Sequence, residues 1–313
     1  MVNEKMIKNF LFNPKEGKTI FNPEGKGPGF WIGAPTIIWD KETNKYFLYV
    51  RVRNPRPEDG KVKPDDTYRG YKCQIYESDD GIDFNLVWEM RKHEIGARSM
   101  EQAALIKIEG KFHIILSYES PGTIPRWKIV KQTANHPSEF TPQGFEKMNW
   151  NVPFFCKFSI KDPIIKEFNN KYYLFIDYIR LKKPWTTTGI LVSTDGDKFE
   201  WLGEVFTNSK DCEWAQFLMR LTSVFEINEK YLGFFDGTSK LKNVCDEKSG
   251  ICSGDKIEEL EIWSLEKPAY QSEYGKGSVR YLYALKRENI IDIYYDYTEL
   301  QGEHVLKKKS VQI

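Results

Sequence analysis

The chain has 313 residues, of which 40% are hydrophobic and 15% are aromatic, enough material for a continuous core. Its 46 lysines and arginines nearly balance its 45 aspartates and glutamates, so no global field draws the protein to nucleic acid or to an anionic membrane, and we expect neither as a partner. The first ten residues lack the apolar run of a signal peptide or membrane span, and we therefore expect a cytoplasmic protein.

Five segments repeat one pattern: a short apolar strand, a polar turn of Asn, Gly, Lys or Glu, and an aromatic-rich strand. In chain order they are APTIIWDKETNKYFLYVRV, QAALIKIEGKFHIILSYE, DPIIKEFNNKYYLFIDYI, LTSVFEINEKYLGFFDGT and RYLYALKRENIIDIYYDYT, starting at Ala34, Gln102, Asp162, Leu221 and Arg280. A second, weaker hairpin with Asp-Gly follows in YESDDGIDFNLV and VSTDGDKFEWLGEVF. Four strands in every ~60 residues predict an all-β fold, a five-bladed β-propeller that forms a single domain over residues 1–313.

Three other segments complete the prediction. The segment before Gly33 contains no copy of the repeat, and we expect it to supply a strand that closes the ring with the last blade. The Pro-rich and charge-rich insertion Arg53–Asp66 is either a surface loop or a lid over the channel mouth. Helical periodicity is scarce, and only Lys256–Trp263 is expected to hold a turn or two.

Cysteine and histidine spacing argues against a metal centre. The five cysteines form an odd set without a CxxC pair, which disfavours a disulfide framework and a zinc site and favours idle thiols. The four histidines are not spaced as a ligand pair, and no P-loop, nucleophile elbow or dinucleotide fingerprint occurs. We expect no bound metal and no cofactor.

In a propeller, the first strand of each repeat lines the channel and the second returns to the same face, so two rings of residues meet at one mouth. The first ring is predicted to contain Gly33, Ala34, Glu101, Gln102, Lys161, Asp162, Arg220, Leu221, Val279 and Arg280. The second ring is predicted to contain Arg51, Arg53, Ser117, Glu119, Asp177, Ile179, Asp236, Thr238, Tyr295 and Tyr297. Charged groups at such positions indicate a functional site, or alternatively an ion-pair network that plugs the channel.

Glycoside hydrolysis requires two facing carboxyl groups, one protonated and one ionised. Glu101 and Asp162 come from adjacent repeats and are the predicted catalytic pair, with Asp236 as a third candidate. If each of the three is held by an arginine, the carboxyl separations of ~5–9.5 Å that glycosidases use are lost and the enzyme hypothesis weakens.

Arginines are unusually many at the predicted mouth, and their forked guanidinium groups suit an anionic substrate or a phosphate co-substrate. The predicted substrate-binding residues are Arg51, Arg53, Arg69, Arg98, Glu119, Asp177, Arg220 and Arg280. Four tryptophans expected in loops would stack on sugar rings or pack in the core and rim: Trp31, Trp127, Trp185 and Trp214.

The segments KDPIIKEFNNKYYLF, ILVSTDGDKFEWLGEVF and RLTSVFEINEKYLGFFDG resemble recurring phrases of the five-bladed β-propeller glycosidases. This superfamily spans glycoside hydrolase families 43, 32, 62, 68 and 130 and includes arabinanases, β-xylosidases, invertases, levansucrases and mannoside phosphorylases. The resemblance covers nearly the whole chain and implies a glycan-active enzyme, a hydrolase or a phosphorylase.

The resemblance to arabinanase-like members implies an Asp base before the first blade's strand, a supporting Asp in the third blade and a Glu acid in the fourth. Asp162 matches the third position, but Ala34 stands at the first and Arg220-Leu221 at the fourth. The phosphorylases use a single carboxylic acid and bind phosphate with basic side chains, which fits the arginines better. The alternatives to an enzyme of this class are a non-catalytic carbohydrate-binding or scaffold propeller and a different chemistry, such as a lyase, on the same scaffold.

Overall fold

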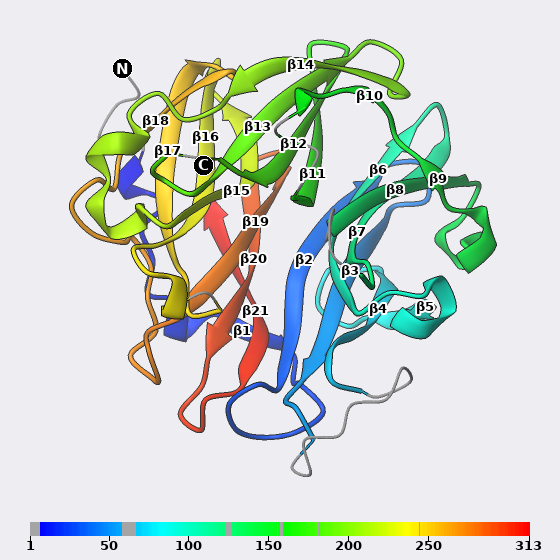
Figure 1. Ribbon diagram of the computed structural model, residues 1–313, viewed down its shortest axis with the longest axis horizontal. Helices are drawn as coiled ribbons and strands as arrows, with labels where there is room; N and C mark the ends of the chain where they lie inside the picture. Colours follow the sequence, from blue (N-terminus) through cyan, green and yellow to red (C-terminus); the bar gives the residue numbers. More distant parts are fainter. Residues whose placement is uncertain are drawn as a thin grey trace.

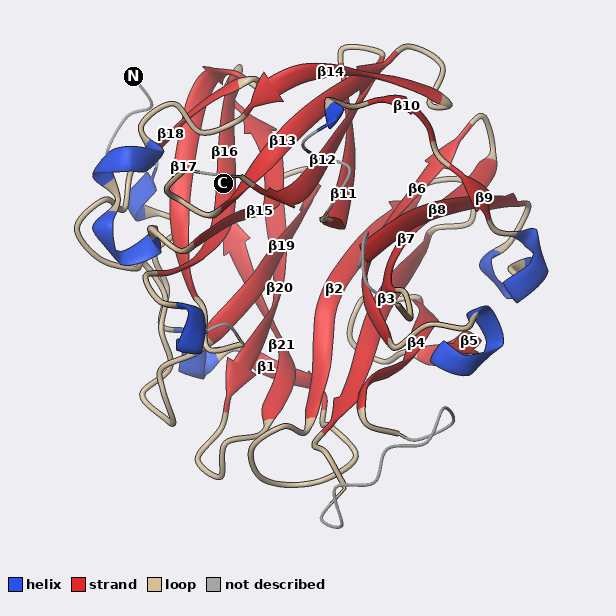
Figure 2. Ribbon diagram, viewed as in Figure 1, coloured by secondary structure: helices blue, strands red, loops and turns tan. Residues whose placement is uncertain are grey.

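The structure is a computed structural model that describes residues 7–57, 67–122, 127–154, 156, 159–180, 182–243 and 245–313. Most of these residues form β-strands, and short helical turns connect some of the strands (Figure 2). Within the insertion Arg53–Asp66, for which a lid is one interpretation, residues 58–66 lie outside the described residues. No helix among the described residues is long and apolar enough to cross a membrane.

The described strands pair into five antiparallel sets, which follow one another along the chain. The first set is β2 (Trp31–Asp40), β3 (Lys45–Asn54), β4 (Arg69–Ser78) and β5 (Asn85–Arg91). The second set is β6 (Ser99–Ile108), β7 (Lys111–Glu119), β8 (Trp127–Ala134) and β9 (Glu146–Lys147). The third set is β11 (Ile160–Phe168), β12 (Lys171–Ile179), β13 (Thr186–Ser193) and β14 (Lys198–Glu204), with β10 (Asn149–Asn151) parallel to β14.

The chain termini share the last of these sets. The fourth set is β15 (Leu218–Ile227), β16 (Lys230–Thr238), β17 (Lys248–Lys256) and β18 (Glu259–Ile262). The fifth set is β19 (Val279–Arg287), β20 (Ile290–Thr298), β21 (His304–Gln312) and β1 (Lys18–Phe21). Lys18 of β1 pairs with Lys308 of β21, so the segment before Gly33 supplies the outer strand of the last set.

The first strands of the five sets surround a common axis (Figure 1). Contacts run from β2 to β6, then to β11, β15 and β19, and back from β19 to β2, which closes the ring. Side-chain hydroxyls join neighbouring inner strands: Thr36 Oγ1 donates to the Ala103 carbonyl at 2.6 Å, and Thr222 Oγ1 donates to the Leu282 carbonyl at 2.9 Å. These bonds fix the position of one inner strand along the common axis relative to the next.

Turn residues determine the hairpins that begin each set. Two-residue turns with positive φ match the right-handed twist of antiparallel strands, and Gly and Asn adopt positive φ most readily. Gly110 has a φ of 78°, and Asn169, Asn170 and Asn228 have φ values between 50° and 57°. In the outer hairpins, Ser78 Oγ accepts the Gly81 N–H at 2.9 Å, so the predicted Asp-Gly signals also form turns.

The expectation of a helical turn at Lys256–Trp263 is wrong. Glu259–Ile262 forms strand β18, which pairs with β17. Leu260 and Ile262 are buried while Glu259 and Glu261 are exposed, and this alternation with a period of two is that of a strand with one buried face.

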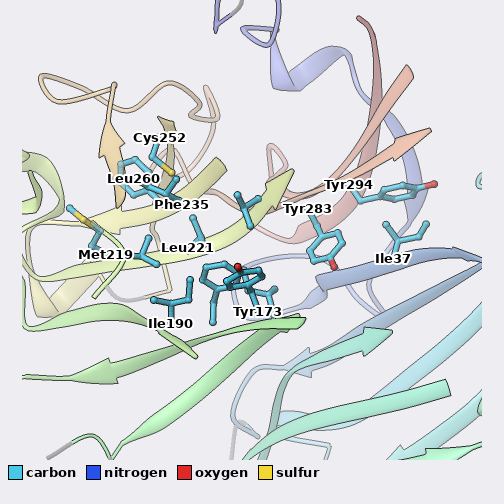
Figure 3. Packing of buried hydrophobic residues seen from close by; sticks show 14 of the residues in the cluster. Ile37, Tyr173, Ile190, Met219, Leu221, Phe235, Cys252, Leu260, Tyr283 and Tyr294 are labelled. Carbon is cyan, nitrogen blue, oxygen red and sulfur yellow. The ribbon is translucent and has the colours of Figure 1, made fainter. Parts of the chain in front are cut away.

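The hydrophobic core lies between neighbouring sets. Ile190 of β13, Leu221 of β15, Tyr283 of β19 and Ile37 of β2 belong to one buried cluster (Figure 3). The inner strands are therefore packed into a core that several sets share. Cys73, Cys156, Cys212 and Cys252 are buried and free, and Cys245 is exposed and free, which agrees with the expectation of thiols outside any disulfide.

Candidate active site

A recurring irregularity shapes the mouth at the start of the inner strands. The register of all five inner hairpins shifts there, as in a β-bulge. At three of these bulges a residue other than glycine has positive φ: Ala34 at 52°, Asp162 at 51° and Tyr281 at 52°. Bulges re-aim side chains, and strained residues of this kind concentrate at functional sites. The sequence positions predicted for the first ring therefore coincide with the irregular part of the structure.

Arg220 links two of the predicted catalytic carboxylates. Its Nη1 lies 2.7 Å from Asp162 Oδ2 and its Nη2 lies 2.8 Å from Asp236 Oδ2, and all three residues are at most 2% exposed. Asp236 also accepts hydrogen bonds from Ser249 Oγ at 2.8 Å and from the Tyr281 N–H at 3.1 Å. Burial raises the pKa of Asp236 above its usual value, although Arg220 opposes the shift.

Asp162 is ionised. Burial alone would raise its pKa, but Lys161 and Arg220 together hold the pKa of this carboxyl well below its usual range. Its Oδ2 contacts Arg220, whereas no described residue forms a hydrogen bond with its buried Oδ1. One oxygen of an ionised carboxylate is therefore unused by the protein.

Glu101 forms a buried ion pair with Arg51. Burial acts to raise the pKa of Glu101, and Arg51 outweighs it, so the pKa of Glu101 lies below its usual value. Each of the three predicted catalytic carboxylates, Glu101, Asp162 and Asp236, is thus held by an arginine. Because an arginine holds each of these carboxylates, the assignment of the proton donor to any of the three is weakened.

Asp177 combines burial with an absence of hydrogen-bond partners. It faces Lys161 across the β11–β12 pair and is 1% exposed, and within the described part of the chain neither of its carboxyl oxygens has a hydrogen-bond partner. Burial raises its pKa to about 7, against the attraction of Lys161 and Arg220. Lys161 Nζ lies 4.0 Å from Asp177 Oδ2 and 3.6 Å from Asp162 Oδ2. Asp177, predicted to bind substrate, is therefore a carboxyl group of raised pKa beside a carboxylate of lowered pKa.

Two further buried carboxyl groups were missed at the sequence level, Asp296 and Glu247. Arg280 faces Asp296 in the β19–β20 pair, one position away from Tyr295 and Tyr297, because the fifth repeat aligns one residue later than expected. The correct alignment is visible in the sequence once Arg280 is matched with Arg220. Glu247, which pairs with Arg280, precedes β17 and has no position in the repeat.

Asp296 lies against the backbone of β2. It accepts the Ala34 N–H at 3.0 Å, and burial raises its pKa to about 7. A Cβ on Gly33 would lie 1.8 Å from Asp296 Oδ1. We expect Gly33→Ala to displace the Asp296 carboxyl and to lower the free energy of unfolding by about 1–3 kcal/mol, measured by denaturant unfolding. Gly96→Ala, where a Cβ would meet no atom within 4 Å, gives an upper bound for the cost of a Gly→Ala change without close contact, because Gly96 has a φ of 64°. An unchanged free energy for Gly33→Ala would contradict the close approach.

The outer part of the mouth is also basic. Glu119 pairs with Arg69 at 2.7 Å, and the half-exposed Arg98 lies 3.9 Å from the same carboxylate. Arg53 is half-buried, and the described residues provide it with no carboxylate partner. The six predicted arginines are therefore brought to one face, five of them beside carboxylates.

Aromatic rings lie among these charges. Trp31 begins β2 instead of lying in a loop, and the guanidinium carbon of Arg280 lies 3.8 Å from its ring centroid. Trp127 begins β8, with Lys161 Nζ 5.5 Å from its ring centroid. Trp185 is 41% exposed. Trp214 lines a hollow of about 190 Å³ together with Thr238, Lys248 and Lys276.

No protein-family model and no curated protein matches the sequence of this chain. Solved structures do match. The β-xylosidase RS223 is 13% identical with a TM-score of 0.64, and the match covers 95% of each chain. The GH43_1 enzyme from Xanthomonas citri complexed with xylotriose is 8% identical with a TM-score of 0.63, over 94% of this chain and 90% of that one. The chain has the fold of the β-propeller glycosidases.

A third β-propeller glycosidase extends the similarity to another hydrolase family. The Bombyx mori GH32 β-fructofuranosidase BmSUC1 is 14% identical with a TM-score of 0.62, and the match covers 99% of this chain and 66% of that one. The all-β propeller fold that the sequence resemblance implies is thereby confirmed. Activity and substrate do not follow from fold similarity at such identities, and they depend on the residues at the mouth.

Proposed function

We propose that this chain is a glycan-active enzyme that cleaves the glycosidic bond of a small oligosaccharide or glycoside at the mouth of a five-bladed propeller. In this proposal the five strand sets are five blades of one domain over residues 1–313. The ring of contacts among the five inner strands and the shared last set of strands support that count.

One feature supports the proposed activity: the carboxyl groups of Asp177 and Asp162 both lie within 4.0 Å of Lys161 Nζ, and their pKa values are shifted in opposite directions, that of Asp177 to about 7 and that of Asp162 well below its usual range. Environments that separate two carboxyl pKa values mark the acid and the ionised partner of a glycosidase. Because Lys161 Nζ lies within 4.0 Å of both, the groups are no farther apart than the ~6.5–9.5 Å of inverting enzymes.

The chemical roles follow from these states. Asp177 donates its proton to the leaving oxygen as the bond from that oxygen to the anomeric carbon breaks. The unpartnered Oδ1 of Asp162 stabilises the positive charge that develops at the anomeric carbon. In hydrolysis a water oxygen then bonds to this carbon, and its proton passes to an ionised carboxylate, Glu101 or Asp162. In phosphorolysis a phosphate oxygen bonds there instead, and the basic mouth would hold the phosphate.

A second candidate function is supported by a specific observation. Glu101, Asp162 and Asp236 are all held by arginines, and Ala34 occupies the position where the resemblance implies a base. These features favour a non-catalytic carbohydrate-binding propeller that retains an ion-pair network in its channel. The two candidates differ in turnover, because both predict that sugars bind.

A substrate panel separates the candidates. Aryl glycosides and short oligosaccharides are incubated with the protein, with and without phosphate, and release of the aryl alcohol or of sugar is measured. We expect wild type to turn over at least one compound and Glu101→Gln to be at least about tenfold slower, because the variant alters the charges around Asp162.

Glu167→Gln, at the exposed opposite end of β11, is the matched control and should retain wild-type turnover. If wild type and Glu101→Gln are equally inert on every compound, the enzymatic proposal is wrong. Calorimetric binding of a sugar without turnover would then support the second candidate.

A further inference from the structure

We propose that the mouth contains a subsite for an acidic group carried by the sugar substrate, built around Trp31. The inference deepens the proposed glycan-active function and rests on it for the statement that the ligand is a sugar. The chemical class is an oxyanion attached to the sugar ring, such as the carboxylate of a uronic acid. We call the residues Trp31, Arg51, Arg53 and Arg280 the Trp31 subsite.

Three guanidinium groups surround one indole ring. The guanidinium carbons of Arg280, Arg51 and Arg53 lie 3.8, 4.6 and 5.8 Å from the ring centroid of Trp31. Stacking on the ring holds the planar groups in place without consuming their N–H donors. The subsite thus concentrates positive charge where few side-chain torsions remain free.

The carboxylates of the protein do not neutralise this charge fully. Glu101 pairs with Arg51 and Glu247 pairs with Arg280, but no described carboxylate pairs with Arg53. Asp296, which lies against β2 and faces Arg280 in the β19–β20 pair, accepts the Ala34 N–H, and burial raises its pKa to about 7, so it carries little negative charge at mildly acidic pH. Burial, together with the neighbouring Arg51 and Arg69, lowers the pKa of Arg53, as expected where cations outnumber anions.

The polar atoms left over in the subsite are donors. Arg280 Nη2, Arg280 Nε, Arg51 Nε and Trp31 Nε1 are buried and have no hydrogen-bond partner among the described residues. Buried donors are nearly always paired in folded proteins, so a cluster of unpaired ones indicates an absent acceptor. A deprotonated oxyanion offers acceptors only and carries the compensating charge, whereas a sugar hydroxyl brings a donor as well.

The subsite adjoins the proposed catalytic carboxyl groups. The guanidinium carbon of Arg51 lies 5.9 Å from the ring centroid of Tyr281, and that of Arg220, which holds Asp162, lies 4.1 Å from the same ring. One tyrosine ring therefore separates the Trp31 subsite from Asp162. An anionic group on the sugar adjoining the cleaved bond would reach the arginines while the bond lies at the carboxyl pair.

The test measures binding and does not require turnover. Methyl glucuronide, methyl glucoside and inorganic phosphate are titrated separately into wild type, Arg53→Gln and Arg53→Lys by calorimetry at low salt. We expect wild type to bind methyl glucuronide about 10- to 100-fold more tightly than methyl glucoside. Arg53→Gln should lose this preference and Arg53→Lys should retain part of it. Arg91→Gln, which removes an exposed arginine on the outer strand β5, should keep the wild-type preference.

Equal binding of the acidic and neutral sugars by wild type would overturn the proposal, as would a preference that Arg53→Gln leaves unchanged. Tight binding of phosphate with no preference for the acidic sugar would also overturn it, because the oxyanion would then be a free co-substrate. Asp177→Asn separates this proposal from the proposed function: an inert protein that still prefers the acidic sugar supports the subsite whatever the outcome of the activity assays.

Discussion

Asp177→Asn is expected to lower kcat/KM for glycosides with alkyl leaving groups about 10²–10⁴-fold while leaving the fold intact. The loss follows from removal of the proton donor, for which general acid catalysis sets this range. The fold should survive because the native carboxyl is already neutral near pH 6 and forms no hydrogen bond that the amide would break. Near pH 3, where this carboxyl is protonated in both the folded and the unfolded chain, the free energy of unfolding should change by no more than about 1 kcal/mol.

The pH dependence of the stability difference between wild type and Asp177→Asn tests the raised pKa of Asp177. Asp177 has a pKa of about 7 in the folded protein, above its ordinary value of 3.8. Between these values the folded state holds a proton that the unfolded state releases, so wild-type stability relative to Asp177→Asn falls as the pH rises, by up to about 1.4 kcal/mol per pH unit. The difference is constant below pH 4 and again above pH 7. Asp79→Asn, on an exposed turn, is the control for the Asp-to-Asn change itself.

Activity should follow the same proton. The kcat/KM of wild type is expected to fall as the pH rises through 7, because the donor loses its proton. A profile that rises through pH 7, or a wild-type stability that increases relative to Asp177→Asn between pH 4 and 7, would contradict the protonated state assigned to Asp177.

Arg220→Met is expected to lower the free energy of unfolding by about 3–5 kcal/mol. Methionine fills a similar volume, but it leaves the carboxylates of Asp162 and Asp236 buried without their shared guanidinium, and an uncompensated buried charge is strongly destabilising. Urea or guanidinium unfolding at pH 7 measures the loss. Lowering the pH should recover part of it, because protonation of the two aspartates removes the unpaired charge.

Arg98→Met is the matched comparison, because Arg98 is half-exposed and lies 3.9 Å from Glu119. We expect a loss of no more than about 1 kcal/mol for this surface pair. A loss for Arg220→Met as small as that for Arg98→Met would show that the buried carboxylates are hydrated or already protonated, and the charge assignments around Asp162 would have to be revised.

The repeat in the sequence was sufficient to predict the strand sets, because turn chemistry and strand alternation are local properties. An Asn-Asn pair between two β-rich runs, such as Asn169 and Asn170, favours a turn. The N-terminal segment contains no copy of the repeat, which indicated that it pairs with another set. The prediction for Lys256–Trp263 failed because the conformation of this short segment depends on the pairing of β18 with β17 and not on its own residues alone.

The candidate site was predicted less completely, because it depends on register and pairing. A shift of one residue in the fifth repeat exchanged Asp296 for Tyr295, since successive side chains of a strand point to opposite faces. The distinction between Asp162 and Asp177 was also invisible, because composition does not reveal which carboxyl receives an arginine. Only the position of Arg220, between Asp162 and Asp236, shows that Asp177 is left without a hydrogen-bond partner.

The leaving-group dependence of Asp177→Asn tests the central claim most directly. For a substrate found in the panel, kcat/KM is compared for an alkyl glycoside and for a 2,4-dinitrophenyl glycoside of the same sugar, whose leaving group departs without a proton. If Asp177 is the donor, the variant loses about 10²–10⁴-fold on the alkyl glycoside and far less on the dinitrophenyl glycoside. Equal losses on both substrates, or no loss on either, would contradict it.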